Sequence, residues 1–91
     1  MVLTKESFEK KQLAEQKGGL YAYYEYRENN RAIVVRIYST AVAVDYYSGA
    51  IDLEDSKDVN ISNEVEAWEE ALAIANEFFK VYEFKGQQEN A

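Results

Sequence analysis

The chain has 91 residues, a formal net charge of −7, and neither histidine nor cysteine. This length accommodates one domain with a single two-layer core. Without cysteine the chain has no disulfide framework and no thiolate metal site, and without histidine it lacks the most common base at neutral pH. Apolar residues make up 47% of the chain, so we expect a folded domain rather than a disordered acidic segment.

The first ten residues contain charged side chains where a secretion signal needs an unbroken apolar stretch. No later segment has the length and apolarity of a membrane span. We therefore expect a cytoplasmic protein with no membrane partner. We expect residues 1–86 to form the domain and residues 87–91 to form a mobile tail.

The N-terminal segment has the punctuation of a helix. Thr4 is a suitable first cap, and the pair Gly18-Gly19 is a suitable end. Phe8 and Leu13 lie about 140° apart on a helical wheel, so such a helix has only a narrow apolar edge. The sequence leaves open whether this helix packs on the rest of the domain.

The segment from residue 20 to residue 54 is rich in Tyr, Val and Ile, which favours strands. Asn29-Asn30 is a strong two-residue hairpin turn, because asparagine accepts positive φ. This turn places three pairs of residues opposite each other: Tyr26 and Ile33, Tyr24 and Val35, Ala22 and Ile37. All six side chains fall on one face of the predicted sheet.

Two further turns extend the same pattern. A turn at Ser39-Thr40 pairs Ile37 with Val42, Val35 with Val44, and Ile33 with Tyr46, and a turn at Ser48-Gly49 pairs Tyr46 with Ile51 and Val44 with Leu53. A slip of one residue at any turn would exchange the faces, so the agreement favours a four-stranded antiparallel meander. A longer link at Ser39-Thr40 or a frayed last strand would leave three strands.

The C-terminal part is predicted to be a polar loop over residues 55–61 followed by a long helix. Ser62 or Asn63 caps this helix, and Asn63 with Glu66 has the spacing of a capping box. Apolar residues recur at helical spacing and form one wide face: Val65, Trp68, Ala71, Leu72, Ile74, Ala75, Phe78, Phe79, Val81 and Tyr82. Residues 81–85 fit either a helix or a strand. The expected fold is α+β: an N-terminal helix, a three- or four-stranded antiparallel meander, and a long C-terminal helix packed on one sheet face.

The most distinctive chemical feature is a run of acids between residues 52 and 70 with Lys57 as its single base. Such a surface repels nucleic acid and membrane phosphates and attracts basic proteins. Its alternative interpretation is an ordinary solvated polar surface. The eight acids are the candidate partner-binding residues: Asp52, Glu54, Asp55, Asp58, Glu64, Glu66, Glu69 and Glu70.

A second candidate surface is the sheet face opposite the predicted core. Tyrosine and arginine are enriched at binding hot spots, and Tyr23 lies opposite Arg36 at cation–π distance in the predicted register. The alternative is that exposed strands simply favour these residue types. The candidate residues for a partner or dimer contact are Tyr21, Tyr23, Arg36, Tyr38 and Tyr47.

No pattern in the chain indicates catalysis or a cofactor. Ser7 and Lys10 match an S-x-x-K spacing, but the companion motifs of that chemistry are absent. The acids at positions 52, 54, 55 and 58 lack the central glycine of a calcium loop, and the glycines form no phosphate-binding motif. We therefore expect no catalytic residue, no metal and no cofactor. A hydrolase that uses only carboxylates is the least favoured alternative.

In size, acidity and expected element order the chain is similar to small phage proteins that disarm host defences, among them anti-CRISPR inhibitors. Because eight acids accompany a single base in a folded region, we expect a stoichiometric inhibitor or adaptor that docks its acids on a basic nucleic-acid-binding surface of another protein, without contacting nucleic acid itself. The resemblance is an analogy for this role. It implies no site residues. The alternative is a homodimeric structural or accessory protein that assembles through its Tyr-rich sheet face.

Overall fold

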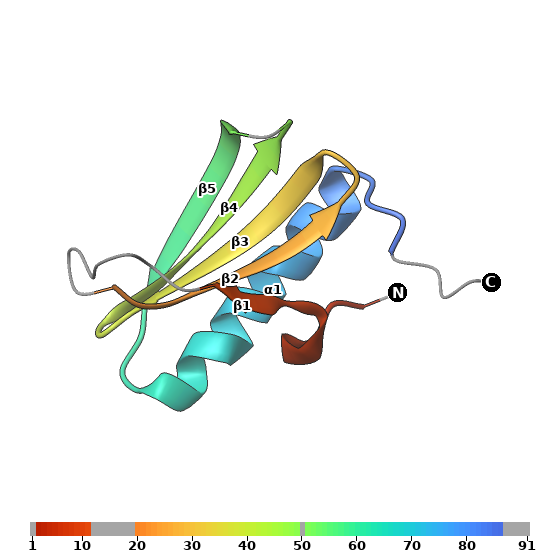
Figure 1. Ribbon diagram of the computed structural model, residues 1–91. Helices are drawn as coiled ribbons and strands as arrows, with labels where there is room; N and C mark the ends of the chain where they lie inside the picture. The colour runs from red at the N-terminus through yellow and green to blue at the C-terminus, as the bar shows by residue number, and fades with distance from the viewer. Residues whose placement is uncertain (1, 12–19, 50, 87–91) are drawn as a thin grey trace.

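The computed structural model describes residues 2–11, 20–49 and 51–86. In chain order, these residues form a 3₁₀ turn η1 (Lys5–Ser7), five strands and one long helix, and Figure 1 shows the helix lying across one face of the sheet. The strands are β1 (Glu9–Lys11), β2 (Leu20–Glu28), β3 (Arg31–Tyr38), β4 (Ala41–Ser48) and β5 (Asp52–Asn60), and the helix is α1 (Glu64–Val81). The fold is therefore α+β as predicted, but the predicted strand number is wrong: the described residues form an antiparallel sheet of five strands, rather than three or four, in the order β1-β2-β3-β4-β5.

The registers predicted for the two central hairpins are confirmed. Tyr26 pairs with Ile33 and Tyr24 with Val35 across β2 and β3. Val35 in turn pairs with Val44 across β3 and β4. Asn29 has a φ of 57°, the positive value that the first turn requires. Because these registers hold, the apolar side chains of three neighbouring strands share one face.

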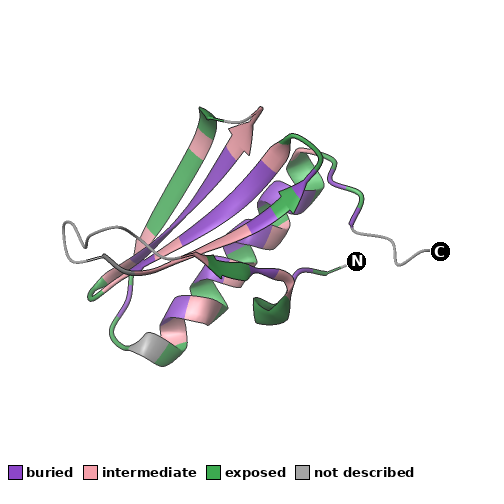
Figure 2. Ribbon diagram, viewed as in Figure 1, coloured by how far each residue is buried: buried purple, intermediate pink, exposed green. Residues whose placement is uncertain are grey.

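The core lies between that face and α1, as the burial colours in Figure 2 show. Ile33, Val35 and Val44 are completely buried, and Ala71 and Ala75 of α1 are buried against the sheet. The two alanines lie four residues apart on one side of the helix and have no bulky side chain, so α1 can approach the sheet closely. The outer positions of the predicted apolar face, Val65 and Val81, are exposed. No helix in the described part of the chain is both long enough and apolar enough to cross a membrane.

The capping prediction for α1 is confirmed, and the ambiguity at its end is resolved. Asn63 accepts the Glu66 N–H at 3.1 Å. After Val81 the chain leaves the helix through Glu83, whose φ is 56°. The Phe84 N–H donates to the Phe79 carbonyl at 2.9 Å and the two rings stack, which is the bonding and contact pattern of a Schellman motif. Residues 82–85 are therefore neither helix nor strand.

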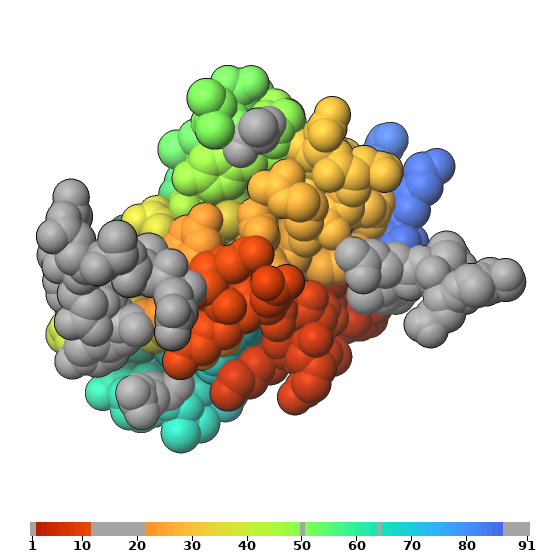
Figure 3. Space-filling model, in the orientation of Figure 1, coloured from red at the N-terminus to blue at the C-terminus, as the bar shows by residue number. Residues whose placement is uncertain are grey.

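The predicted N-terminal helix is wrong for residues 4–11, and the rest of that prediction lies outside the described residues. Only one 3₁₀ turn forms, and the chain then extends into β1, which pairs with β2. Figure 3 shows this segment, in red, against β2, in orange. The extended path buries both Leu3 and Phe8, and Phe8 contacts Tyr26 and Trp68. A helix with one narrow apolar edge would not bury both residues.

The prediction for the last strand is wrong in its extent and its register. β5 begins at Asp52 opposite Ser48 and continues to Asn60, through the segment predicted to be a loop. Ser48 pairs with Asp52, so the register already differs by three residues from the predicted one at the start of β5, and an irregularity between Tyr46 and Tyr47 adds one more. Val44 therefore lies opposite Lys57 rather than Leu53. The strand lacks apolar alternation because it is an edge strand and most of its side chains are exposed.

Candidate protein-binding surface

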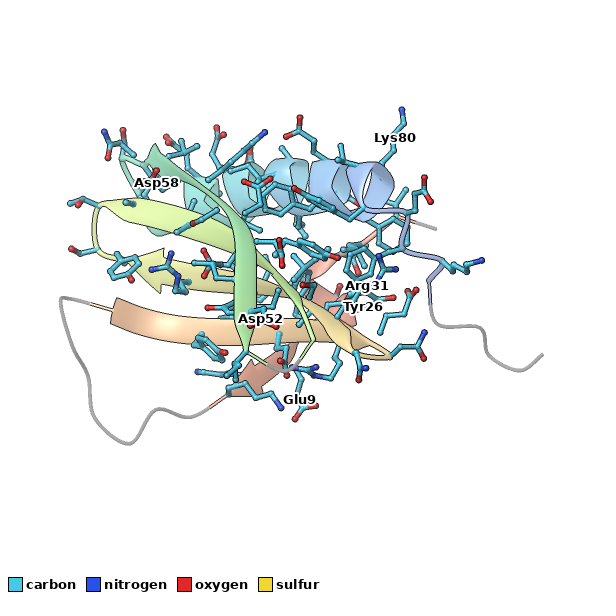
Figure 4. All side chains as sticks on the ribbon, turned by 90° about the horizontal axis from the view of Figure 1, so that it is seen from above. Glu9, Tyr26, Arg31, Asp52, Asp58 and Lys80 are labelled. Atoms are coloured by element: carbon cyan, nitrogen blue, oxygen red, sulfur yellow. The ribbon has the colours of Figure 1, made fainter. Side chains whose placement is uncertain are left out.

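The acids of β5 line the edge of the sheet. Asp52, Glu54 and Asp58 are exposed, and Figure 4 labels Asp52 and Asp58 near the two ends of the strand. Asp55 is partly buried, because its side chain faces α1 and accepts the Tyr82 hydroxyl proton at 2.6 Å. This hydrogen bond raises the pKa of Tyr82 to about 12. The sequence placed the last two of these acids in a loop, and the structure places all four on one strand.

One flank of α1 faces the same strand. Lys57 of β5 donates to Glu77 at 2.8 Å, which identifies the flank. Glu70 lies seven residues before Glu77, and Glu66 four residues before Glu70, so both lie on that side of the helix. We call the combined set the acidic surface; its members are Asp52, Glu54, Asp55, Asp58, Glu66 and Glu70.

Two of the eight sequence candidates are not part of this set. Glu69 is exposed on the other flank of α1, where it lines a groove with Leu3 and Asn76. The Asn76 amide connects the two sides of this groove: it donates to the Leu3 carbonyl at 3.0 Å and accepts the Leu3 N–H at 2.7 Å. The side chain of Glu64 lies outside what the structure describes. The acidic surface therefore comprises the β5 edge and the flank of α1 next to it, and it excludes Glu69.

Lys57, the single base among the acids of β5, is already paired with another acid, Glu77. The Lys57 ammonium group forms an ion pair with Glu77 and lies 5.8 Å from the centre of the Phe78 ring. The hydrogen bond to Glu77 is the main cause of a raised pKa at Lys57, which stays charged. Among the described residues, no lysine or arginine forms an ion pair with any of the six acids. The negative charge is therefore not neutralised within the described part of the fold.

The strand geometry does not gather these acids into a metal site. Side chains alternate along β5, so Asp55 and Lys57 face α1 while Ser56 and Asp58 face the other way. Within residues 2–11, 20–49 and 51–86, no three acidic side chains converge to hold a cation. The arrangement presents separate charges to solvent, which suits an electrostatic protein contact rather than a chelating site.

The sheet face opposite α1 carries the tyrosine and arginine candidates. Tyr23 pairs with Arg36 as predicted. The Arg36 guanidinium instead lies over the Tyr38 ring, at 5.7 Å from its centre, and donates to the Tyr38 hydroxyl at 2.6 Å. Its other two contacts go to Asp45. Because its donors are used within the chain, Arg36 is poorly placed to bind a foreign acid.

The tyrosines on this face are partly buried by their neighbours. Burial is the main cause of the raised pKa values of Tyr23 and Tyr47. Val34, which shares this face, is 1% exposed, although no helix within residues 2–11, 20–49 and 51–86 covers it. The side chain of Tyr21 lies outside the described part of the structure. The described tyrosines of this face, Tyr23, Tyr38 and Tyr47, are therefore only partly accessible to a partner.

Two exposed apolar residues next to β4 were not among the sequence candidates. Ile51 is 83% exposed and Leu53 is 55% exposed, and Leu53 lies opposite Tyr47. The predicted register placed both residues in the core, so the sequence analysis did not identify them as exposed apolar residues. Asp52 lies between the two residues in the sequence and Glu54 follows Leu53, which places apolar area beside the acidic surface.

Comparisons of the chain with models of protein families, with curated proteins and with solved structures give no match.

Proposed function

We propose that this protein is a non-enzymatic binding protein that docks its acidic surface on a basic surface of another protein. A nucleic-acid-binding site is the partner surface that fits best, because it already presents cations spaced to meet phosphates. Occupying that site would make the protein a stoichiometric inhibitor or adaptor. The resemblance to phage inhibitors rested partly on an N-terminal helix, which residues 4–11 do not form, so it adds no support.

A single observation carries the proposal. Six acids lie on β5 and the facing flank of α1, and the lysine among them is paired with Glu77. An uncompensated field of this kind speeds encounter with a cationic partner and repels phosphate. By contrast, the cationic group at the centre of the tyrosine face, Arg36, is paired with Asp45.

The test compares two variants with the same change of net charge. The first carries Asp58→Lys and Glu70→Lys on the acidic surface, and the control carries Glu6→Lys and Glu69→Lys, which replace exposed acids elsewhere. Tagged wild type and both variants are used to capture proteins from cell extract. Captured proteins are quantified by mass spectrometry, with and without competing duplex DNA.

We expect the wild type and the control to retain DNA-binding proteins that duplex DNA or added salt displaces, and the first variant to lose them. Affinity for a basic site should fall steeply between 50 and 500 mM salt, because exposed charges are then screened over about 4 Å rather than 14 Å. Equal capture by both variants, or binding indifferent to salt, would refute the proposal.

The alternative of a homodimer is favoured by one observation, the exposed pair Ile51 and Leu53 beside Tyr47. A second copy could cover this apolar area. Light scattering on a size-exclusion column measures the mass directly. A dimer that becomes a monomer on Leu53→Asp would support this alternative, and a monomeric wild type would exclude it.

A further inference from the structure

Strand β5 ends the sheet and has an open edge. It spans nine residues, Asp52–Asn60, and pairs with β4 on one side only within the described part of the chain. Apart from Asp55 and Val59, its residues are exposed along the whole strand, as the green ribbon in Figure 2 shows. In an edge strand, alternate N–H and C=O groups point away from the sheet and can pair with another chain. In β5 one N–H, that of Ser56, already donates to the Asp55 carboxylate at 2.8 Å, so an added strand would pair with the other outward groups.

The opposite edge of the sheet is different. There the edge strand is β1, which has only three described residues, Glu9–Lys11. Short edge strands are one way in which proteins block further pairing. The long β5 edge therefore offers the larger template for an added strand.

The charge of β5 selects the occupant. The strand carries Asp52, Glu54, Asp55 and Asp58 with Lys57 as its only base. A second copy of β5 would bring mostly like charges together across the new ladder, which destabilises pairing. A segment rich in lysine or arginine would instead bring opposite charges together at the same positions.

The acids are also distributed over both faces of the strand. Asp55 faces α1, whereas Asp58 lies opposite Ala43 on the other face. An added strand with a base at every second residue therefore meets an acid on whichever side its bases fall. Glu70 on the flank of α1 adds charge on the helix side.

We infer that β5 binds an extended basic segment of a partner protein as a sixth antiparallel or parallel strand, with backbone hydrogen bonds to the open edge. This inference rests on the proposed function and specifies how a partner protein binds the acidic surface. Backbone pairing supplies affinity and register, and the acids supply the preference for basic side chains. A purely electrostatic contact would need neither an extended partner nor free backbone N–H groups.

The probe is a heptapeptide of alternating lysine and threonine with blocked ends, titrated into the full chain at 50 mM salt. Its matched control has the same side chains and charge, but every backbone nitrogen is methylated, so it cannot donate to a strand. Binding is measured by calorimetry, and hydrogen exchange of each backbone amide is followed by NMR. The Asp58→Lys variant reports the contribution of charge.

We expect the unmodified peptide to bind at least tenfold more tightly than the methylated peptide. The outward amides of β5, about every second residue, should exchange at least tenfold more slowly in the complex, and Asp58→Lys should weaken binding. Equal binding of the two peptides, or protection elsewhere than β5, would overturn strand addition while leaving the electrostatic proposal intact. No binding of either peptide would overturn both.

Discussion

Arg36 on β3 and Asp45 on β4 form a bidentate ion pair on the sheet face opposite α1, with Nε–Oδ2 and Nη2–Oδ1 distances of 2.7 and 2.9 Å. Asp45 is 2% exposed and also accepts the Ser56 hydroxyl proton at 2.6 Å. The pair therefore links three adjacent strands, β3, β4 and β5. Forked geometry and a second donor compensate the carboxylate for its loss of water.

Removing the arginine should be more harmful than neutralising the acid. Arg36→Met leaves the buried Asp45 carboxylate without its cation and should lower the free energy of unfolding by about 3 kcal/mol. Asp45→Asn should lower the free energy of unfolding by about 2 kcal/mol. The loss is smaller because the Arg36 side chain is 31% exposed and can still be hydrated. Urea unfolding followed by circular dichroism measures both values.

The exposed pair Lys57–Glu77 provides the control for this prediction. Both of its side chains are about half exposed, at 48% and 52%. Surface ion pairs contribute little because solvent and salt screen them. Lys57→Met should therefore cost clearly less than Arg36→Met, and equal losses would contradict the assignment of a structural role to the buried pair.

Glu28 on β2 should make stability depend on pH in acid. Its buried carboxylate accepts the N–H groups of Lys85 and Gly86 at 2.8 Å and the Tyr26 hydroxyl proton at 3.0 Å. Burial alone would raise the pKa of Glu28, but these hydrogen bonds outweigh it and the pKa is lowered. A lowered pKa means that the stabilisation is full above the ordinary pKa of about 4.3 and is lost as pH falls through the folded value.

The variant Glu28→Gln isolates this effect. At pH 7 it should lower the free energy of unfolding by about 2 kcal/mol, because a neutral amide is a weaker acceptor than a carboxylate. Below pH 4 the difference from wild type should shrink, since wild-type Glu28 is then protonated. Urea unfolding between pH 3 and pH 7 checks this, with the exposed Glu69→Gln as control. A difference that stays constant across this range would contradict the prediction.

The register of β5 can be tested by a pair of apolar substitutions. Val44 is completely buried, so Val44→Ala should cost about 2 kcal/mol. Leu53 is 55% exposed, so Leu53→Ser should cost less than about 1 kcal/mol. Had Leu53 lain opposite Val44 in the core, its replacement would cost at least as much as that of Val44. Chemical unfolding of both variants distinguishes the two registers.

The central hairpins were predictable because two independent signals agreed in them. The positive φ of the Asn29 turn and the alternation of apolar residues specify the same register for β2 and β3. The helix was predictable for a similar reason, since its apolar face and its Asn63 cap indicate the same starting point. Local chemistry and long-range burial were consistent in these elements.

The ends of the sheet lacked that agreement. β5 forms through backbone pairing with β4, and its polar side chains give no alternation from which to infer a strand. At the N-terminus, Thr4 and the glycines suggested a helix, but burial of Leu3 and Phe8 in the core favours an extended path. The acidic residues were identified from composition, whereas the separation of Glu69 from the others depends on which flank of α1 meets β5.

The hydrogen bond between Tyr82 and Asp55 should be visible in the titration of tyrosine. It raises the pKa of Tyr82 to about 12, against an ordinary value near 10. Because the folded pKa is higher, this contact contributes stability below pH 10 that is lost as pH rises toward 12. The difference in ultraviolet absorbance between wild type and Tyr82→Phe isolates this tyrosine from the other seven. Asp55→Ser should return the Tyr82 pKa toward 10, and an unchanged value would show that β5 does not place Asp55 against α1.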